Sequence, residues 1–373
     1  MERDQGARPS THDPMILTST TGTRRQFLRR QVGPVFLATF GLGPAEAAPP
    51  EDESECGELV SLSRIAMACR FEILLPAGEE DAWEPVQEAL ELADDLERQM
   101  TVFREDSEIS RVNREAAHRP VAVESRLFAL LDLAARLARE TAGAFDITAG
   151  SLARLWRSCR AQDRLPTTAE IKSARAAVGM SWIRLDHERR TVSFTSENVA
   201  LDLGAIGKGY ALDRICESLR SAGVTAALVH AGHSSIAAMG RPAREQGWTV
   251  SISDGTDGSR PRPRVRLRDH CMATSGSAQR FREVDGKRYG HIIDPRTGWP
   301  AEAVLSATAI APTAAEADAL ATAFYIMGLE ATRAYCAKHP GVFALMIVGP
   351  PDAQGAPRVV NVGSPDPPLE VTV

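Results

Sequence analysis

The sequence predicts an α+β fold in which mixed, largely antiparallel sheets are flanked by helices. Segments with the two-residue period of strands and segments with the period of helices both occur, but they do not alternate regularly along the chain. The sequence contains no repeat of fixed length, no Walker loop and no Gly-x-Gly-x-x-Gly fingerprint, so the common nucleotide-binding folds are not expected. A chain of 373 residues with 43% hydrophobic residues can bury a sizeable core.

The N-terminal half begins with a strand and two helices. Residues 70–75 are predicted to form a strand because most of them are apolar. Residues 81–100 have apolar positions at helical spacing, which predicts an amphipathic helix. A second helix over 125–141 is stopped by Gly143. Short strands bounded by turn residues are then expected over 182–185 and 191–194.

The C-terminal half is predicted to contain three helices and five short strands. A helix is predicted over 207–219, after a glycine-rich turn. The predicted strands cover residues 226–230, 248–251, 265–267, 304–310 and 342–348. Two further helices are predicted over 314–327 and 329–338. Residues 254–264 are rich in glycine, proline and charge, which indicates a surface loop.

The N-terminus has the pattern of an export signal. The string Thr23-Arg-Arg-Gln-Phe-Leu-Arg-Arg30 precedes an apolar stretch over 32–42, and Ala45-Glu46-Ala47 has the form of a cleavage site. This order is typical of a twin-arginine signal. Glycines and prolines in the stretch disfavour the alternative, a basic helix of the fold. We therefore expect cleavage of residues 1–47, a leader over 48–60, and export of a soluble protein to the periplasm.

Charge and cysteine usage exclude several classes of protein. The formal net charge is −6 and there is no concentrated basic stripe, which argues against nucleic acid as a partner. The six cysteines are scattered, without a CxxC pair or a histidine at metal-site spacing. A disulfide framework or a zinc site is therefore not expected.

Two oxygen-bearing side chains lie near the start of the helix predicted over 314–327. In Ala317-Asp-Ala-Leu-Ala-Thr322, the four-residue spacing puts the Asp318 carboxylate and the Thr322 hydroxyl on one helix face. Mg²⁺ takes oxygen ligands and favours sites completed by substrate phosphates, so two such side chains with backbone carbonyls would suit it. The alternative is that Asp318 merely favours the helix start.

A glycine-rich string has the character of a phosphate site. Leu201-Asp-Leu-Gly-Ala-Ile-Gly-Lys-Gly-Tyr-Ala-Leu-Asp213 leads into a helix whose first turn bears Lys208. Free backbone amides and a cation at such a place attract phosphate. Lys208 is one of only four lysines in the chain, which favours a specific role. An ordinary strand-to-helix turn with a solvated lysine is the alternative.

Two aromatic residues and one rigid turn complete the candidate site. Phe103 and Phe145 could flank a planar ring, although aromatic residues at such positions are more often part of the core. The string His291-Ile-Ile-Asp-Pro-Arg-Thr-Gly-Trp-Pro300 places His291 and Asp294 on a turn stiffened by proline and glycine. Such a turn presents its polar side chains in few directions, and a plain hairpin corner is the alternative.

Together these strings resemble the ApbE family, the FAD:protein FMN transferases. The matching strings occur in the family's order and are Met67-Ala-Cys-Arg-Phe-Glu, residues 100–113, Gly143-Ala-Phe-Asp-Ile-Thr, Asp202-Leu-Gly-Ala-Ile-Gly-Lys-Gly-Tyr, Thr274-Ser-Gly, His291-Ile-Ile-Asp-Pro-Arg-Thr-Gly and Ala317-Asp-Ala-Leu-Ala-Thr. The resemblance runs from about Ser63 to Val348. It implies a two-lobed ApbE-like domain over 61–350, followed by a C-terminal tail over 351–373.

The resemblance implies an enzyme that takes FAD as substrate and Mg²⁺ as cofactor. It would attach FMN by a phosphoester to a threonine or serine of an acceptor protein and release AMP. In this family the acceptor is typically an exported subunit of a membrane redox complex. Mg²⁺ would be held by Asp318 and Thr322 with the carbonyls of Ala205 and Ala321. The residues that would contact FAD are Met67, Phe103, Ala144, Phe145, Asp146, Asp202, Lys208 and Ile293.

The acceptor hydroxyl must lose a proton during such a transfer. His291 is the candidate general base because imidazole titrates near neutral pH. Asp294 could orient His291, or a different carboxylate could serve as the base. An FAD pyrophosphatase and a flavin-binding protein without turnover are the alternative functions.

The sequence departs from the family pattern at three places. The usual Met-Gly-Thr is Met67-Ala68-Cys69, and Gly207 replaces an alanine. The usual Gly-Gly-Asp/Asn is Gly232-His233-Ser234, which adds side-chain bulk at a position that the family leaves open. His233 could therefore narrow the pocket, change flavin affinity or be turned outward.

Overall fold

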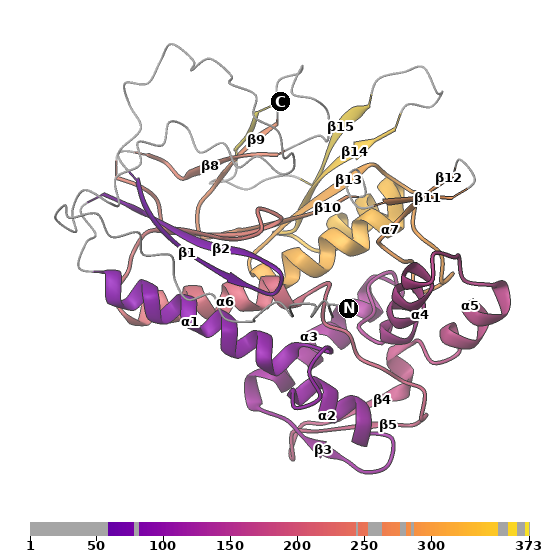
Figure 1. Cartoon of the computed structure of the whole chain (residues 1–373). Coiled ribbons are helices and arrows are strands. Elements are labelled where there is room, and N and C mark those ends of the chain that lie inside the picture. Colours follow the sequence, from indigo (N-terminus) through magenta and orange to yellow (C-terminus); the bar gives the residue numbers. More distant parts are fainter. Residues whose placement is uncertain are drawn as a thin grey trace, which may run out of the picture.

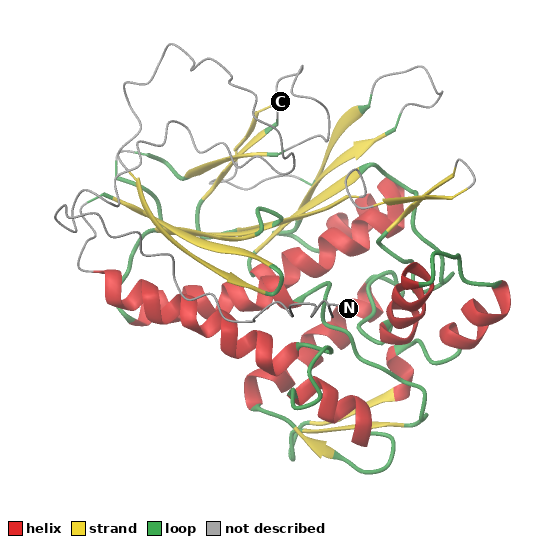
Figure 2. Ribbon diagram, in the orientation of Figure 1, coloured by secondary structure: helices red, strands yellow, loops and turns green. Residues whose placement is uncertain are grey.

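A computed structural model confirms the α+β fold class (Figures 1 and 2). The structure describes residues 59–77, 82–243, 245–252, 263–276, 281–284, 287–349, 357–363 and 370–372. The proposed signal over 1–47 and most of the leader lie outside these residues. So do residues 253–262, which hold most of the loop expected over 254–264. Within the described part, no helix is both long enough and apolar enough to cross a membrane.

An eight-stranded sheet forms the centre of the described structure. The strand order is β1-β2-β6-β7-β10-β13-β14-β15, and every neighbouring pair is antiparallel. The strands are β1 (Leu59–Ala66), β2 (Cys69–Pro76), β6 (Ala227–Ala231), β7 (Ser235–Met239), β10 (Cys271–Gly276), β13 (Ser306–Ala311), β14 (Phe343–Val348) and β15 (Arg358–Val362). Since their register alternates side chains between two faces, the sheet separates two cores.

Three long helices cover one face of this sheet, as Figure 2 shows. They are α1 (Trp83–Met100), α6 (Gly207–Ser221) and α7 (Ala314–Lys338). The helices predicted over 314–327 and 329–338 are both present, but they run on within α7 across Gly328, which has a non-helical φ of 77°. This face holds the larger core, and it also carries the candidate site.

A three-stranded sheet packs against the opposite face. Its order is β16-β9-β8, with β8 (Trp248–Ser251), β9 (Arg264–Leu267) and β16 (Glu370–Thr372). The second core lies between the two sheets and includes Leu228, Ile236 and Trp248. The C-terminal segment expected to be a tail thus contributes β15 to the large sheet and β16 to the small one. Neither strand is predicted by the sequence.

Most of the remaining helices and short strands lie below the long helices in the view of Figure 1, with α2 near the end of α1 and α4 and α5 below α7. The helices are α2 (Glu108–Glu115), α3 (Ser125–Glu140), α4 (Gly150–Ala161) and α5 (Thr168–Arg175). The strands β3 (Val121–Ala122), β5 (Thr191–Phe194) and β4 (Ile183–Asp186) form a small sheet, and a short 3-10 helix, Met180–Trp182, precedes β4. A separate hairpin, β11 (Phe281–Val284) and β12 (Lys287–Gly290), precedes the turn at His291.

Candidate active site

The first turn of α6 and the first turns of α7 meet at one buried point. The Asp318 side chain is buried, and its Oδ2 accepts a hydrogen bond from the Gly209 amide at 3.0 Å. Oδ1 accepts from the Ser235 hydroxyl at 3.1 Å and lies 3.6 Å from Lys208 Nζ. The structure therefore brings the predicted phosphate residue and the predicted metal residue together, although 110 positions separate them in the chain.

Hydroxyl groups from the large sheet surround this pair. Lys208 Nζ donates to Ser234 Oγ at 2.7 Å and to Ser235 Oγ at 3.0 Å. Thr322 Oγ1 lies 3.3 Å from Ser275 Oγ and 3.4 Å from the Asp318 carbonyl oxygen. Ser235 and Ser275 are not among the site residues predicted from the sequence. Ser275 could have been predicted to lie in the site because it belongs to the Thr274-Ser-Gly string.

This oxygen-rich cluster has the donor chemistry of a magnesium site. A buried carboxylate, a hydroxyl one turn later and nearby carbonyls are hard ligands, and an ammonium group beside them suits phosphate. No three His, Cys, Asp or Glu side chains gather at metal-binding separation within the described ranges. A cation bound by Asp318 would complete its coordination with hydroxyl, carbonyl, water and phosphate oxygens. Ala205, in the turn before α6, and Ala321, on α7, are the predicted carbonyl donors.

The junction of α6 and α7 depends on close backbone packing. A Cβ atom at Gly209 would lie 2.0 Å from the Ala314 carbonyl oxygen, so only glycine fits there. One turn later, Asp213 accepts hydrogen bonds from the amides of Ala314 and Ala315 at 2.7 and 2.9 Å. These bonds cap the N-terminus of α7. The cap and the glycine contact together fix the position of Asp318 relative to Lys208.

Asp213 should make protein stability depend on pH. Burial raises the pKa of Asp213 from 3.8 to about 6. The folded state therefore binds a proton more tightly than the unfolded state does, and the stabilisation that results is complete below about pH 4 and is lost as pH rises through about 6. A shift of about two pKa units corresponds to about 3 kcal/mol.

We expect Asp213→Asn to remove this pH dependence. The free energy of unfolding of the native protein, relative to that of the variant, should fall by about 3 kcal/mol between about pH 4 and about pH 7. Urea unfolding of both proteins at the two pH values measures this difference. Parallel pH profiles for the two proteins would contradict the assignment.

A cleft with a volume of about 420 Å³ opens between the segment after α1, helix α4 and residues 200–202. Phe103 lines it, and its side chain is 79% exposed. The Arg157 guanidinium lies 5.1 Å from the centre of the Phe103 ring and 3.2 Å from Asp202. Phe103 and Asp202, two of the residues predicted to contact FAD, therefore share one cavity.

The prediction that Phe145 flanks a planar ring is wrong for its side chain. Phe145 is 1% exposed and belongs to the main core, as does the neighbouring Ala144. Asp146 is largely buried, and this burial raises its pKa. Its Oδ1 accepts hydrogen bonds from the amide and hydroxyl of Thr148, which holds the turn before α4. This segment can meet a ligand through backbone atoms or Asp146, but not through the phenyl ring.

The turn over residues 291–300 is rigid, as its sequence predicts. Gly298 has a φ of 80°, and its carbonyl accepts a hydrogen bond from Trp156 Nε1 of α4 at 2.9 Å. Ile293 forms a bridge with Pro300 across the turn. His291 is exposed at its start.

The Asp294 carboxylate forms an ion pair with Arg296 of the same turn. Its Oδ1 accepts from the amide and Nε of Arg296, and its Oδ2 accepts from Nη2, each at 2.9 Å. Both oxygens of Asp294 are thus engaged with Arg296. The residue stabilises the turn, and its role in orienting His291 stays a prediction.

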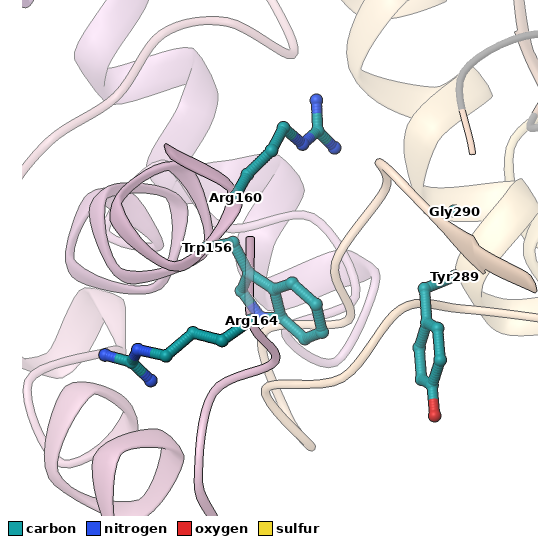
Figure 3. A pocket seen from close by; sticks show the side chains of 5 residues that line it. All are labelled: Trp156, Arg160, Arg164, Tyr289 and Gly290. Atoms are coloured by element: carbon teal, nitrogen blue, oxygen red, sulfur yellow. The ribbon is translucent and has the colours of Figure 1, made fainter. Parts of the chain in front are cut away.

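A small hollow lies between α4 and the end of β12, next to His291 (Figure 3). Trp156, Arg160 and Arg164 line it from one side, and Tyr289 and Gly290 line it from the other. Its volume of about 10 Å³ is close to that of one water molecule, so it does not hold a substrate. The cleft beside Phe103, at about 420 Å³, is far larger than this hollow.

His233 is turned away from the Lys208 cluster. Gly232 and His233 both have positive φ, and the His233 ring packs on His230 with ring centres 4.3 Å apart. His230 is opposite Ile236 in register and therefore shares its sheet face, which is the face of the second core. The structure therefore favours an outward orientation of His233 over a narrowed pocket or a changed flavin affinity.

Met67 and Ala68 form the tight turn between β1 and β2, and Ala68 replaces the glycine that is usual in the family. Both residues have positive φ, at 50° and 57°, as a two-residue hairpin loop requires. The Met67 amide donates to Glu97 Oε2 on α1 at 2.8 Å. The hairpin tip is thereby held at the end of α1, near the segment that carries Phe103.

Comparison with known proteins agrees with the fold. The model of the ApbE family matches residues 67–347. A Treponema pallidum protein named FAD:protein FMN transferase is 32% identical over 333 residues, which cover 85% of this chain and 90% of that protein. A protein of the same name from Salmonella typhimurium is 33% identical over 238 residues, covering 62% of this chain and 67% of that protein.

Solved structures lead to the same assignment. The flavin transferase ApbE from Vibrio cholerae superposes with a TM-score of 0.72 at 30% identity, covering 82% of this chain and 98% of that one. The ApbE protein from Thermotoga maritima gives a TM-score of 0.72 at 29% identity, covering 81% of this chain and 96% of that one. The chain, whose family motifs meet at the α6–α7 junction, belongs to the ApbE family.

Proposed function

We propose that this protein is a Mg²⁺-dependent FAD:protein FMN transferase. The observation that carries the proposal is the buried contact among Lys208, Asp318 and Ser235, which places a phosphate-binding cation beside a metal-binding carboxylate. The proposal is supported by the names of the relatives and by the likeness to solved flavin transferases. FAD is the substrate, and an acceptor protein with a threonine or serine is the partner.

The residues of the cluster would bind and orient the pyrophosphate. Mg²⁺ bound by Asp318, Thr322 and the carbonyls of Ala205 and Ala321 would neutralise phosphate charge. Lys208, held by Ser234 and Ser235, is placed to contact the same phosphates. We assign the other contacts to FAD to Met67, Phe103, Ile293, Asp202 and the backbone of residues 144–146.

The acceptor hydroxyl oxygen attacks the phosphorus of the FMN moiety in this reaction. A new phosphorus–oxygen bond forms, the bond to the bridging oxygen breaks, and AMP leaves with that oxygen. The proton of the hydroxyl must pass to a base, and His291 is our candidate because it is exposed at the start of a rigid turn.

His291→Ala is expected to slow FMN attachment by at least about 100-fold, since general base catalysis contributes about that much or more. The assay incubates the protein with FAD, Mg²⁺ and a panel of acceptor peptides, and detects the added FMN by mass spectrometry. FAD binding, followed by flavin fluorescence, should change little. His118→Ala is the matched control because His118 is exposed in the turn after α2. Wild-type transfer by His291→Ala would exclude this residue as the base.

The same assay separates the alternative functions. Free FMN and AMP without a modified acceptor would indicate an FAD pyrophosphatase. Tight FAD binding without AMP release would indicate a flavin-binding protein. We further propose that residues 1–47 direct export by the twin-arginine route and that the acceptor is an exported subunit of a membrane redox complex. Detection of the processed protein only in the cytoplasmic fraction would contradict the export proposal.

A further inference from the structure

The turn that carries His291 is attached to helix α4 by one side chain. Trp156 of α4 donates its indole N–H to the Gly298 carbonyl oxygen, with the two heavy atoms 2.9 Å apart. The Trp156 ring also meets the Trp299 ring edge to face, with ring centres 5.7 Å apart and an interplanar angle of 77°. Trp156 therefore contacts two consecutive residues of the turn, through a hydrogen bond and through an aromatic contact.

The side of the turn that Trp156 contacts is bonded to the side that carries His291. The Asp294 amide donates to the Trp299 carbonyl at 2.8 Å, and the Ala301 amide donates to the Ile292 carbonyl at 2.9 Å. Ile292 directly follows His291 in the chain. Because these backbone bonds join the two sides of the turn, the position of Trp299 sets the position of the His291 backbone.

Apolar packing also holds the turn against α4 and α5. A Cβ atom at Gly298 would lie 2.6 Å from Ile171 Cγ2 and 3.2 Å from Leu152 Cδ2, so the backbone of the turn lies directly on these buried side chains. Apolar contact is not directional, whereas a hydrogen bond prefers a nearly linear arrangement. The bond from Trp156 therefore fixes the orientation of the turn, which apolar packing alone would leave open.

Helix α4 is in turn held on the segment that precedes α6. The Gly150 amide, at the start of α4, donates to the Ala200 carbonyl at 3.1 Å, and a Cβ atom at Gly150 would lie 2.5 Å from the same oxygen. Further along α4, Arg157 forms an ion pair with Asp202 at 3.2 Å. Because the first turn of α6 bears Lys208, α4 connects the turn of the proposed base to the proposed phosphate site.

We propose that Trp156 is a positioning residue for FMN transfer and holds His291 at a fixed place relative to the phosphates bound at Lys208. The inference rests on the proposed transferase function, with His291 as the base. A general base must lie within about 3 Å of the hydroxyl that it deprotonates, so a small displacement of the turn would slow the reaction. Trp156 acts through the turn and does not itself take part in the chemistry.

Trp156→Phe should slow FMN attachment by about tenfold or more, because a displacement of about 1 Å can cost about 100-fold in rate. Phenylalanine keeps an aromatic ring and lacks the N–H donor. The rate is measured at saturating FAD and Mg²⁺ with an acceptor peptide that the native protein modifies. KM for FAD should change little. Trp182→Phe is the matched control, because Trp182 lies in a different element, the 3-10 helix before β4.

A double-mutant cycle separates positioning of the base from a general effect on the fold. If Trp156 acts through His291, Trp156→Phe should lower the transfer rate by less than about twofold in a protein that already carries His291→Ala. Replacing Trp156 by benzothienylalanine, which keeps the bicyclic ring and lacks the N–H, should show the same dependence on His291. Thermal unfolding of each variant verifies that it is folded.

Three results would overturn the proposal. The first is a native transfer rate in both variants at position 156. The second is an equal slowing by Trp156→Phe whether His291 is present or replaced by alanine. The third is a native rate in His291→Ala, because His291 would then not be the base. Failure of the transferase function has a different signature, since the native protein itself would attach no FMN to any peptide.

Discussion

Asp318→Asn is expected to reduce FMN transfer by at least about 100-fold, the upper end of what loss of a residue supporting a metal site typically costs. The Asp318 carboxylate is only 6% exposed and lies 3.6 Å from Lys208 Nζ. Asparagine keeps the shape of the side chain and can still accept from the Gly209 amide. It lacks the negative charge that a divalent cation requires. The substitution should therefore slow the metal-dependent step of FMN transfer without preventing folding.

The measurement is the rate of AMP release and of FMN attachment as a function of Mg²⁺ concentration. Asp132→Asn serves as the control, because Asp132 lies half-exposed on α3. Thermal unfolding of Asp318→Asn verifies that the variant is folded. If this variant reached the wild-type rate at any Mg²⁺ concentration with a wild-type metal requirement, Asp318 would not be a ligand.

Gly209→Ala is expected to destabilise the protein by about 3 kcal/mol or more, at the upper end of the cost of overpacking. The added methyl group would lie 2.0 Å from the Ala314 carbonyl oxygen and 2.8 Å from the Ala315 amide nitrogen. Both are backbone atoms, so no side-chain rotation relieves the clash. The helices must separate, which would also break the hydrogen bond from Gly209 to Asp318. Urea unfolding measures the change in the free energy of unfolding.

Gly207→Ala provides a control two residues away in the same helix. A Cβ atom at Gly207 would lie 3.8 Å from Met100 Cε, which is an ordinary contact. Alanine also loses less conformational entropy than glycine on folding, and we expect a gain of about 0.5–1 kcal/mol. Equal effects of the two substitutions would mean that α6 and α7 do not pack as closely as described.

Much of the site follows from patterns that are local in sequence. The four-residue spacing of Asp318 and Thr322 fixes their common helix face, and Lys208 follows a glycine-rich turn that predicts a helix start. Local patterns do not reveal that these segments meet. Their contact depends on the register of β6, β7 and β10, which places Ser235 beside Asp318 through pairings distant in sequence.

Side-chain partners and burial were less predictable. Phe103 and Phe145 each come shortly after the end of a long helix, yet one is exposed in a cleft and the other is in the core, because tertiary packing decides burial. Asp294 pairs with Arg296, a choice that depends on the exact turn geometry. Strands β15 and β16 were not predicted because their formation depends on pairing with β14 and β9. These partners lie alongside them only in the folded protein.

The α6–α7 junction decides which parts of the molecule can move during turnover. The backbones of Gly209 and Ala314 pack too closely to admit a side chain at Gly209. Asp213 accepts hydrogen bonds from two consecutive amides in the first turn of α7. Sliding or hinging at this point would require bonds to break, so the junction is a rigid joint. Lys208 and Asp318 therefore keep their spacing while substrate enters and product leaves. Any rearrangement that turnover requires must therefore occur outside this junction.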